Sequence, residues 1–95
     1  MIIKIFSIFD SKAQAYLPPF LLPNEEMAKR VFRDCANDTN HQFGKHPADY
    51  TLFHLGAFSD ENGRIETLET PYPICKAIEL VKEPAQTLEL FQKEA

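Results

Sequence analysis

The sequence of 95 residues is poor in several residue types: it has no tryptophan, three glycines and two cysteines. Cys35 and Cys75 lie far apart without a Cys-x-x-Cys motif, so we expect two reduced, buried thiols rather than a zinc site or disulfide framework. Ten Lys/Arg against fourteen Asp/Glu give a net charge of −4, which argues against tight, non-specific binding of a polyanion. The acidic surplus lies in residues 55–95, so we expect any polyanion to bind residues 1–54.

Long hydrophobic runs are also missing. No stretch approaches the roughly 20 apolar residues of a membrane helix. The apolar residues 1–6 are soon followed by Ser7 and Asp10, and they lack the apolar core and cleavage site of a signal peptide. We therefore expect a cytoplasmic protein without membrane contact. The length fits one domain, which we place at residues 1–83, with a C-terminal tail or short helix at 84–95.

The pattern of apolar residues predicts an α+β fold. Residues 2–9 are apolar on both alternating faces, which is typical of a central strand covered on two sides. Residues 50–58 and 64–69 are predicted to form two more strands, joined by a turn at Asn62-Gly63. Apolar residues at helical spacing after Asn24, a good N-cap, predict a helix over 25–36. We expect this helix to pack on a small, mainly antiparallel sheet.

Prolines and polar residues predict the connections. Three prolines exclude a helix or central strand from residues 13–23, where we expect an extended segment. The part from Tyr16 to Pro23 fits either a docking strip for a partner or a cover for the sheet. We expect a polar loop at 41–49 and a break in the chain at Pro71 and Pro73. Residues 74–82 fit both a helix and a short strand.

No pattern in the sequence indicates catalysis or a cofactor. Cys35 falls on the apolar stripe of the predicted helix, which favours a core position over a nucleophile. His41 and His46 are five positions apart and His54 is eight further on, with no cysteine pair to complete a metal site. No phosphate-binding, dinucleotide-binding or metalloprotease motif is present. We expect a protein that is not an enzyme and has neither cofactor nor metal.

Binding of single-stranded nucleic acid needs positive charge beside aromatic rings. The basic candidates are Lys29, Arg30 and Arg33 on the polar face of the predicted helix and Lys45 and His46 in the following loop. The aromatic candidates are Tyr16, Phe20 and Phe43. The alternatives are a solvated helix face, because Lys29 and Arg30 have acidic partners four residues earlier, and core positions for Phe20 and Phe43.

The order of certain residues over 2–68 resembles a phage protein family. The most specific part is His-Pro-x-Asp-Tyr-x-Leu-x-x-Leu-Gly-x-Phe at residues 46–58. The other matching residues are Lys4–Ile8, Asp10, Lys12, Pro18–Phe20, Pro23, Asn24, Ala28, Arg30, Phe32, Asp34, Asn37, Phe43 and Gly63. They are similar to the small nonstructural protein of gokushovirus-type microviruses, which are bacteriophages with single-stranded DNA genomes. The resemblance implies a non-virion, DNA-binding protein in the cytoplasm of the host bacterium.

These observations lead to two hypotheses. The first is a nonstructural phage protein that binds single-stranded DNA, or the replication and packaging complex, during the switch to single-stranded genome synthesis. The second is a protein–protein interaction or assembly module that does not bind DNA directly, with phage replication or assembly proteins as partners. A small core gains from extra burial, so we also expect a homodimer or higher oligomer.

Overall fold

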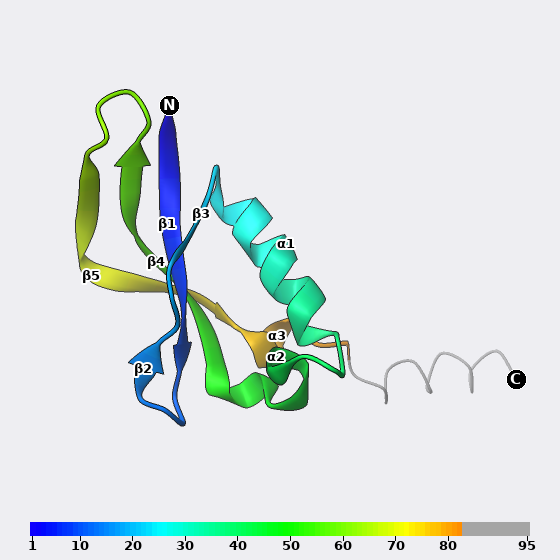
Figure 1. Cartoon of the computed structure of the whole chain (residues 1–95). Coiled ribbons are helices and arrows are strands. Elements are labelled where there is room, and N and C mark those ends of the chain that lie inside the picture. Colours follow the sequence, from blue (N-terminus) through cyan, green and yellow to red (C-terminus); the bar gives the residue numbers. More distant parts are fainter. Residues whose placement is uncertain (83–95) are drawn as a thin grey trace, which may run out of the picture.

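The computed structural model describes residues 1–82, so the tail predicted at 84–95 lies outside the described residues. It has the expected α+β architecture, in which a five-stranded antiparallel sheet is packed against helices (Figure 1). The first strand, β1 (Ile2–Asp10), pairs with β4 (Tyr50–Ser59) on one side. Its other side pairs with two short strands, β2 (Ala15–Tyr16) and β3 (Phe20–Leu22). The sheet ends at β5 (Ile65–Lys76), which pairs with β4.

The helix α1 (Glu25–Ala36) has the bounds predicted from its pattern. The side chain of Asn24 caps it, because Asn24 Oδ1 accepts a hydrogen bond from the Met27 N–H at 2.9 Å. Ala28, Phe32 and Ala36 recur at helical spacing and are buried, so they form the stripe that faces the sheet. The helix runs along one side of the sheet (Figure 1).

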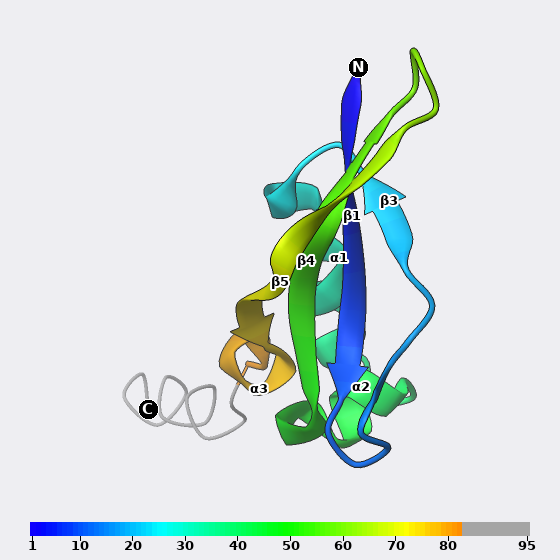
Figure 2. The ribbon, with the colours of Figure 1, turned by 90° about the vertical axis from the view of Figure 1, so that its left-hand side faces the viewer.

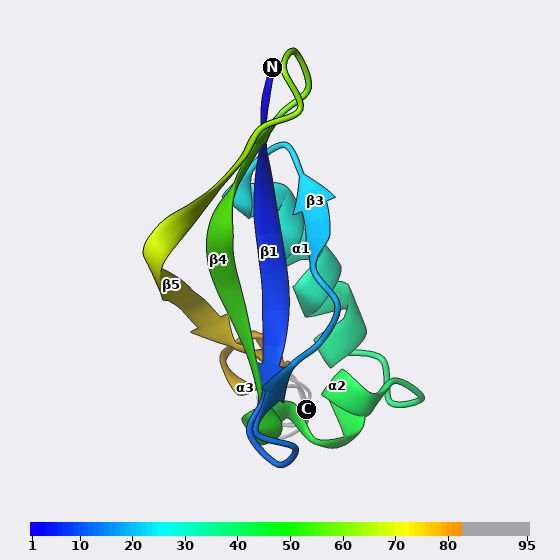
Figure 3. The ribbon, with the colours of Figure 1, turned by 60° about the vertical axis from the view of Figure 1, so that its left-hand side comes forward.

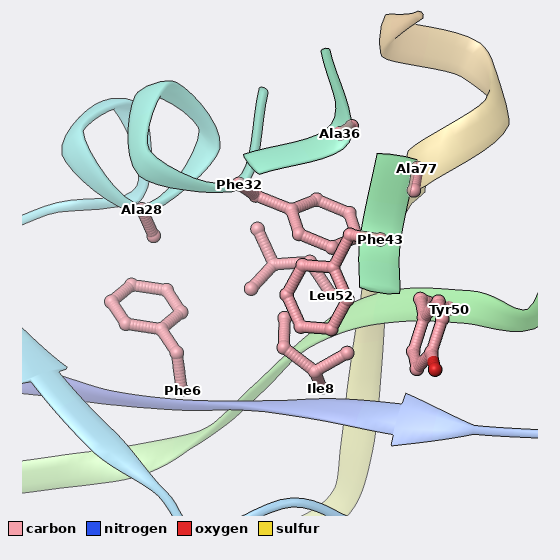
Figure 4. Close-up of a cluster of buried hydrophobic side chains, with 9 residues drawn as sticks. All are labelled: Phe6, Ile8, Ala28, Phe32, Ala36, Phe43, Tyr50, Leu52 and Ala77. Atoms are coloured by element: carbon pink, nitrogen blue, oxygen red, sulfur yellow. The ribbon is translucent and has the colours of Figure 1, made fainter. Parts of the chain in front are cut away.

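The core lies between α1 and one face of the sheet, which we call the helix-side face (Figure 4). Phe6 and Ile8 of β1 and Leu52 of β4 point into it and are almost fully buried. On the helix, Phe32 meets the ring of Phe43 edge-on at 5.5 Å. Aromatic contacts continue to the neighbouring segments, where Phe43 packs on Tyr50 and Phe6 stacks on Phe20.

The expectation of a polar loop at residues 41–49 is wrong. This segment forms two short helical turns, α2 (Gln42–Lys45) and the 3-10 turn η1 (Pro47–Asp49). His41 caps the first turn through Nδ1, which accepts from the Phe43 N–H at 3.1 Å. The turns form because they carry Phe43 and Tyr50 into the core, a tertiary gain that the polar sequence does not reveal.

The break expected at Pro71 and Pro73 is also wrong, because β5 passes through both prolines to Lys76. An edge strand tolerates proline, since its outward N–H groups need no partner within the sheet. The register jumps here: Gly56 pairs with Thr67, whereas His54 pairs with Tyr72. This bulge bends β5 sharply (Figure 3). The ambiguous residues 74–82 divide between the end of β5 and one helical turn, α3 (Ala77–Leu80).

The hairpin between β4 and β5 confirms the turn predicted at Asn62-Gly63. The Ser59 N–H donates to the Arg64 carbonyl at 2.9 Å, and the Gly63 N–H donates to the Ser59 carbonyl at 2.8 Å. Gly63 has φ of 72°, a left-handed conformation that glycine adopts without strain.

The expectation that β1 is covered on two sides is confirmed for the middle of the strand, where Ile5–Ile8 are all buried, but no helix covers the side that Ile5 and Ser7 face. Figure 2 looks onto the sheet with α1 behind it and no helix in front of β1. We call this uncovered side the open face. On this side Ile3 and Phe9 are half-buried, whereas Ile5 is buried by its neighbours. Ser7 is also buried here, and its Oγ donates to the Leu17 carbonyl at 2.6 Å.

Replacing Phe32 by alanine is expected to lower the free energy of unfolding by about 3–5 kcal/mol, because the lost ring leaves a cavity between α1 and the sheet. Urea denaturation measures the change. The control is Val31→Ala, the neighbouring helix position, which is 48% exposed and should change stability by only about 0.5 kcal/mol. Equal losses in the two variants would contradict the placement of α1.

Candidate nucleic-acid interface

Strand pairing defines which side chains share the open face, because directly opposed residues of antiparallel strands point to the same side. The positions on this face are Ile3, Ile5, Ser7, Phe9, Tyr16, Leu21, Thr51, Phe53, Gly56, Phe58, Ile65, Thr67, Pro73 and Lys76. Most are apolar, and Lys76 is the single charged side chain among these paired positions. The open face thus combines a neutral, apolar surface with one basic residue near one end.

Three aromatic rings gather at that end, and we call Phe9, Tyr16 and Phe53 the aromatic cluster. Phe9 and Tyr16 are directly opposed, with ring centroids 4.9 Å apart. Phe53 meets Tyr16 edge-on at 5.4 Å and Phe9 at 6.3 Å. Tyr16 is 45% exposed, and Phe9 and Phe53 are half-buried. Each ring is held by its neighbours, so the cluster is a pre-formed aromatic surface.

Two lysines flank the aromatic cluster. Thr51 pairs with both Phe9 and Lys76, so Lys76 lies in the same row across the sheet as Phe9 and Tyr16. Lys12 is exposed in the turn of residues 11–14, which joins the end of β1 that carries Phe9 to the strand β2 that carries Tyr16. The Asp10 carboxylate holds this turn by accepting the Lys12 N–H at 3.0 Å. Rings beside ammonium groups suit a ligand with flat bases and a phosphate backbone.

The basic residues predicted on the helix lie on the other side of the sheet from Tyr16. Arg30 and Arg33 are exposed on the outer surface of α1 and line a shallow hollow with Asn24, Glu26 and Met27. Lys29 has Nζ 4.0 Å from Glu25 Oε1, a weak surface ion pair. Because α1 packs on the helix-side face, these three residues and the aromatic cluster do not form one surface.

The other predicted residues are also dispersed. Lys45 and His46 are exposed at the end of α2. Phe20 is half-buried and stacks on Phe6 at 5.9 Å, so it supports the core from its edge. Phe43 is 9% exposed within the core, where its ring does not present a face for a base. Of the three predicted aromatic platforms, Tyr16 is the one on the open face.

Sequence reasoning missed Phe9, Phe53, Lys12 and Lys76. One signal was present, because Phe9 has the opposite parity to Phe6 and Ile8 along β1 and so must face the other side of the sheet. The pattern could not say which of the two apolar faces is covered. It also gave no reason to place Lys76, which follows two prolines, in a strand beside Thr51.

The cysteines form no disulfide and are partly buried. Burial, with smaller contributions from Asp34 and Asp38, raises the pKa of the Cys35 thiol. Burial also raises the pKa of the Cys75 thiol, and Glu79 adds to this. Both thiols are therefore held in the unreactive protonated form at neutral pH. Within residues 1–82, no three His, Cys, Asp or Glu side chains are grouped so as to hold a metal ion.

Comparison with known proteins assigns the chain to a phage family. The model of the family described as Phage ORF5 protein matches residues 3–80, and the chain therefore belongs to this family of bacteriophage proteins. Searches of curated proteins and of solved structures gave no significant match. Among the helices of residues 1–82, none has the length and apolar character needed to cross a membrane.

The raised thiol pKa values predict slow alkylation. Iodoacetamide should modify the native protein at pH 7.5 more slowly than the urea-unfolded chain, because only the thiolate reacts. The variants Cys35→Ser and Cys75→Ser separate the two sites. Because the folded state retains the thiol protons to higher pH, the free energy of unfolding should fall as pH rises above the ordinary thiol pKa. Native thiols that react as fast as unfolded ones would contradict these shifts.

Proposed function

We propose that this phage protein binds single-stranded DNA through the aromatic cluster and its two flanking lysines on the open face. The observation that carries the proposal is the group of Phe9, Tyr16 and Phe53 on an uncovered antiparallel sheet, in one row with Lys76. Aromatic rings on an open sheet stack with unpaired bases, and every base has a face that can stack. The binding we propose is therefore largely independent of base sequence.

Charge supports a ligand held more by stacking than by phosphate contacts. The whole chain is acidic, and Asp60 and Glu61 lie at the hairpin tip, away from the aromatic cluster (Figure 2). Two lysines near the rings imply about two phosphate contacts, which for a single strand gives a slope of log affinity against log salt of about −1.4. Duplex DNA offers no unstacked bases, so the proposal includes a preference for single strands.

The biological role we propose follows from the resemblance at residues 2–68. The protein is a nonstructural component of a gokushovirus-type microvirus and acts in the cytoplasm of the infected bacterium. It covers newly made single-stranded genomes, or recruits them to the replication and packaging machinery, during the switch to single-strand synthesis. It does so as a binding protein without catalysis or cofactor.

Removing one ring of the aromatic cluster is expected to weaken binding strongly. Tyr16→Ala should raise the Kd for a fluorescently labelled oligothymidine by about five-fold or more, because one stacked base contributes about 1–3 kcal/mol. Fluorescence anisotropy gives the Kd, and circular dichroism checks the fold. The matched control is Tyr72→Ala, since Tyr72 is 58% exposed but pairs with His54, on the helix-side face. If Tyr16→Ala binds normally while Arg30→Ala with Arg33→Ala loses binding, the interface is on α1 instead. If the wild-type protein shows no binding at low salt, the assembly module is the better hypothesis.

Removing the two lysines is expected to change the salt dependence. The double variant Lys12→Gln/Lys76→Gln should bind single strands with a slope of log Kd against log salt close to zero, because about two phosphate contacts are lost. The double variant Lys29→Gln/Lys45→Gln removes the same charge elsewhere and should keep the wild-type slope. Titrations at about 25–200 mM salt, where log Kd is linear in log salt, measure this slope for both double variants. Identical slopes in the two double variants would show that the salt dependence arises from the net charge of the whole protein and not from Lys12 and Lys76.

A further inference from the structure

The end of the open face away from the aromatic cluster carries a separate apolar surface, which we call the distal patch: Ile3, Ile5, Leu21, Phe58 and Ile65. Ile65 is 64% exposed and Leu21 is 46% exposed. Ile5 is buried by its neighbours on this face without joining the main core. The patch is drawn from four strands, so it is a property of the folded sheet and not of one segment.

The two sides of the sheet differ in polarity at this end. On the helix-side face, Lys4 pairs with Ala57, which pairs with Glu66. A surface hollow on the same side is lined by Ile2, Ala57, Ser59, Asn62, Arg64 and Glu66, which is a mostly polar set. The distal patch is the apolar counterpart. Alternation of this kind is typical of a sheet with one face in water and the other face buried.

The helix α1 packs on the face opposite the distal patch, and it is also too short to cover the helix-side face at this end of the sheet. The twelve residues of α1 span about 18 Å, whereas the ten residues of β4 span about 33 Å. The hairpin of β4 and β5 and the start of β1 extend past the beginning of α1 (Figures 1 and 2). Residues 60–73 are all exposed. A two-stranded ribbon of this kind is marginally stable by itself, so burial of its apolar side would stabilise it.

We propose that the distal patch packs on the distal patch of a second copy of this chain, forming a two-fold symmetric homodimer. In a two-fold interface each surface meets itself, so charged groups near the axis would face like charges. The paired positions of the patch carry no charge, and self-contact therefore costs no repulsion. A polyanion or an acidic partner would find no countercharge here. Two twisted sheets can pack face to face in this way at about 10 Å.

The proposed dimer is compatible with the proposed DNA binding but does not depend on it. The distal patch lies toward the hairpin, whereas Tyr16 and Lys76 lie at the opposite end of the sheet. Contact through the distal patch would leave both aromatic clusters accessible, one in each subunit. The dimer would then offer two stacking surfaces to one strand, or one surface to each of two strands.

Sedimentation equilibrium of the full chain tests the proposal. The wild type is expected to be mainly a dimer at about 10–100 μM, concentrations above a dissociation constant of about 1 μM. Ile65→Glu with Leu21→Glu should sediment as a folded monomer, because each new charge would be buried in the interface. Both positions are exposed in the single chain, so the folded monomer should survive the change, and circular dichroism checks this.

The matched control is Glu66→Lys, which lies next to Ile65 on the same strand but faces the opposite side. It should remain a dimer. Loss of the dimer in Glu66→Lys as well would assign the contact to the edge of β5 and overturn the face-to-face arrangement. A monomeric wild type, or a dimer that persists in Ile65→Glu/Leu21→Glu, would also overturn it. Anisotropy with oligothymidine reports separately on DNA binding, which the monomeric variant should retain for each subunit.

Discussion

The helix α1, with the short turns α2 and α3, covers only one face of a sheet whose central strand is apolar on both faces, and the rest of the structure depends on this mismatch. β1 has hydrogen-bonded neighbours on both edges, so its side chains must point either to α1 or away from it. Phe6 and Ile8 fill the space beneath Phe32, and burial of such side chains contributes about 1.5–3 kcal/mol each. Phe9, Ile5 and Ile3 have no helix to pack against in the described part of the chain. The surfaces proposed for binding therefore lie on the face that α1 does not cover.

The uncovered face is not uniform, and the two surfaces proposed for binding lie at its opposite ends. Near the turn between β1 and β2 it carries aromatic rings and lysine ammonium groups, which suit a strand of nucleic acid. Near the β4–β5 hairpin it is aliphatic and neutral, which suits another copy of the same surface. The bulges in β4 and β5 separate these ends, because the register shifts between His54 and Gly56 and changes which β4 side chains reach the open face. Gly56 sits at this shift, where a Cβ would come within 2.2 Å of the Glu66 carbonyl oxygen.

Charge is arranged consistently with this division. The net charge of −4 is too negative for a protein that coats DNA by phosphate neutralisation alone. In the proposed mode of binding, stacking on the aromatic cluster supplies affinity without a large positive field, and the two lysines contact the phosphate backbone. The basic residues of α1 are offset by Glu25 and Glu26 in the same helix, so they contribute less field than their number suggests. Membership of the Phage ORF5 family is consistent with a ligand that is held by few charged contacts, but it does not specify the ligand.

The sequence by itself determined those elements whose signals lie within a few neighbouring residues. Asn24 and the apolar stripe through Phe32 specified α1, and Asn62-Gly63 specified the hairpin, because caps, helical spacing and turn chemistry act within a few residues. Only the tertiary structure decided which face of β1 is covered, that Phe43 belongs to the core, and that β5 continues through its prolines as an edge strand. For the same reason, the sequence predicted only part of the candidate site. Tyr16 was found from its aromatic ring and neighbouring prolines, whereas Phe53 and Lys76 reach it through strand pairing between residues far apart in the chain, which no local pattern encodes.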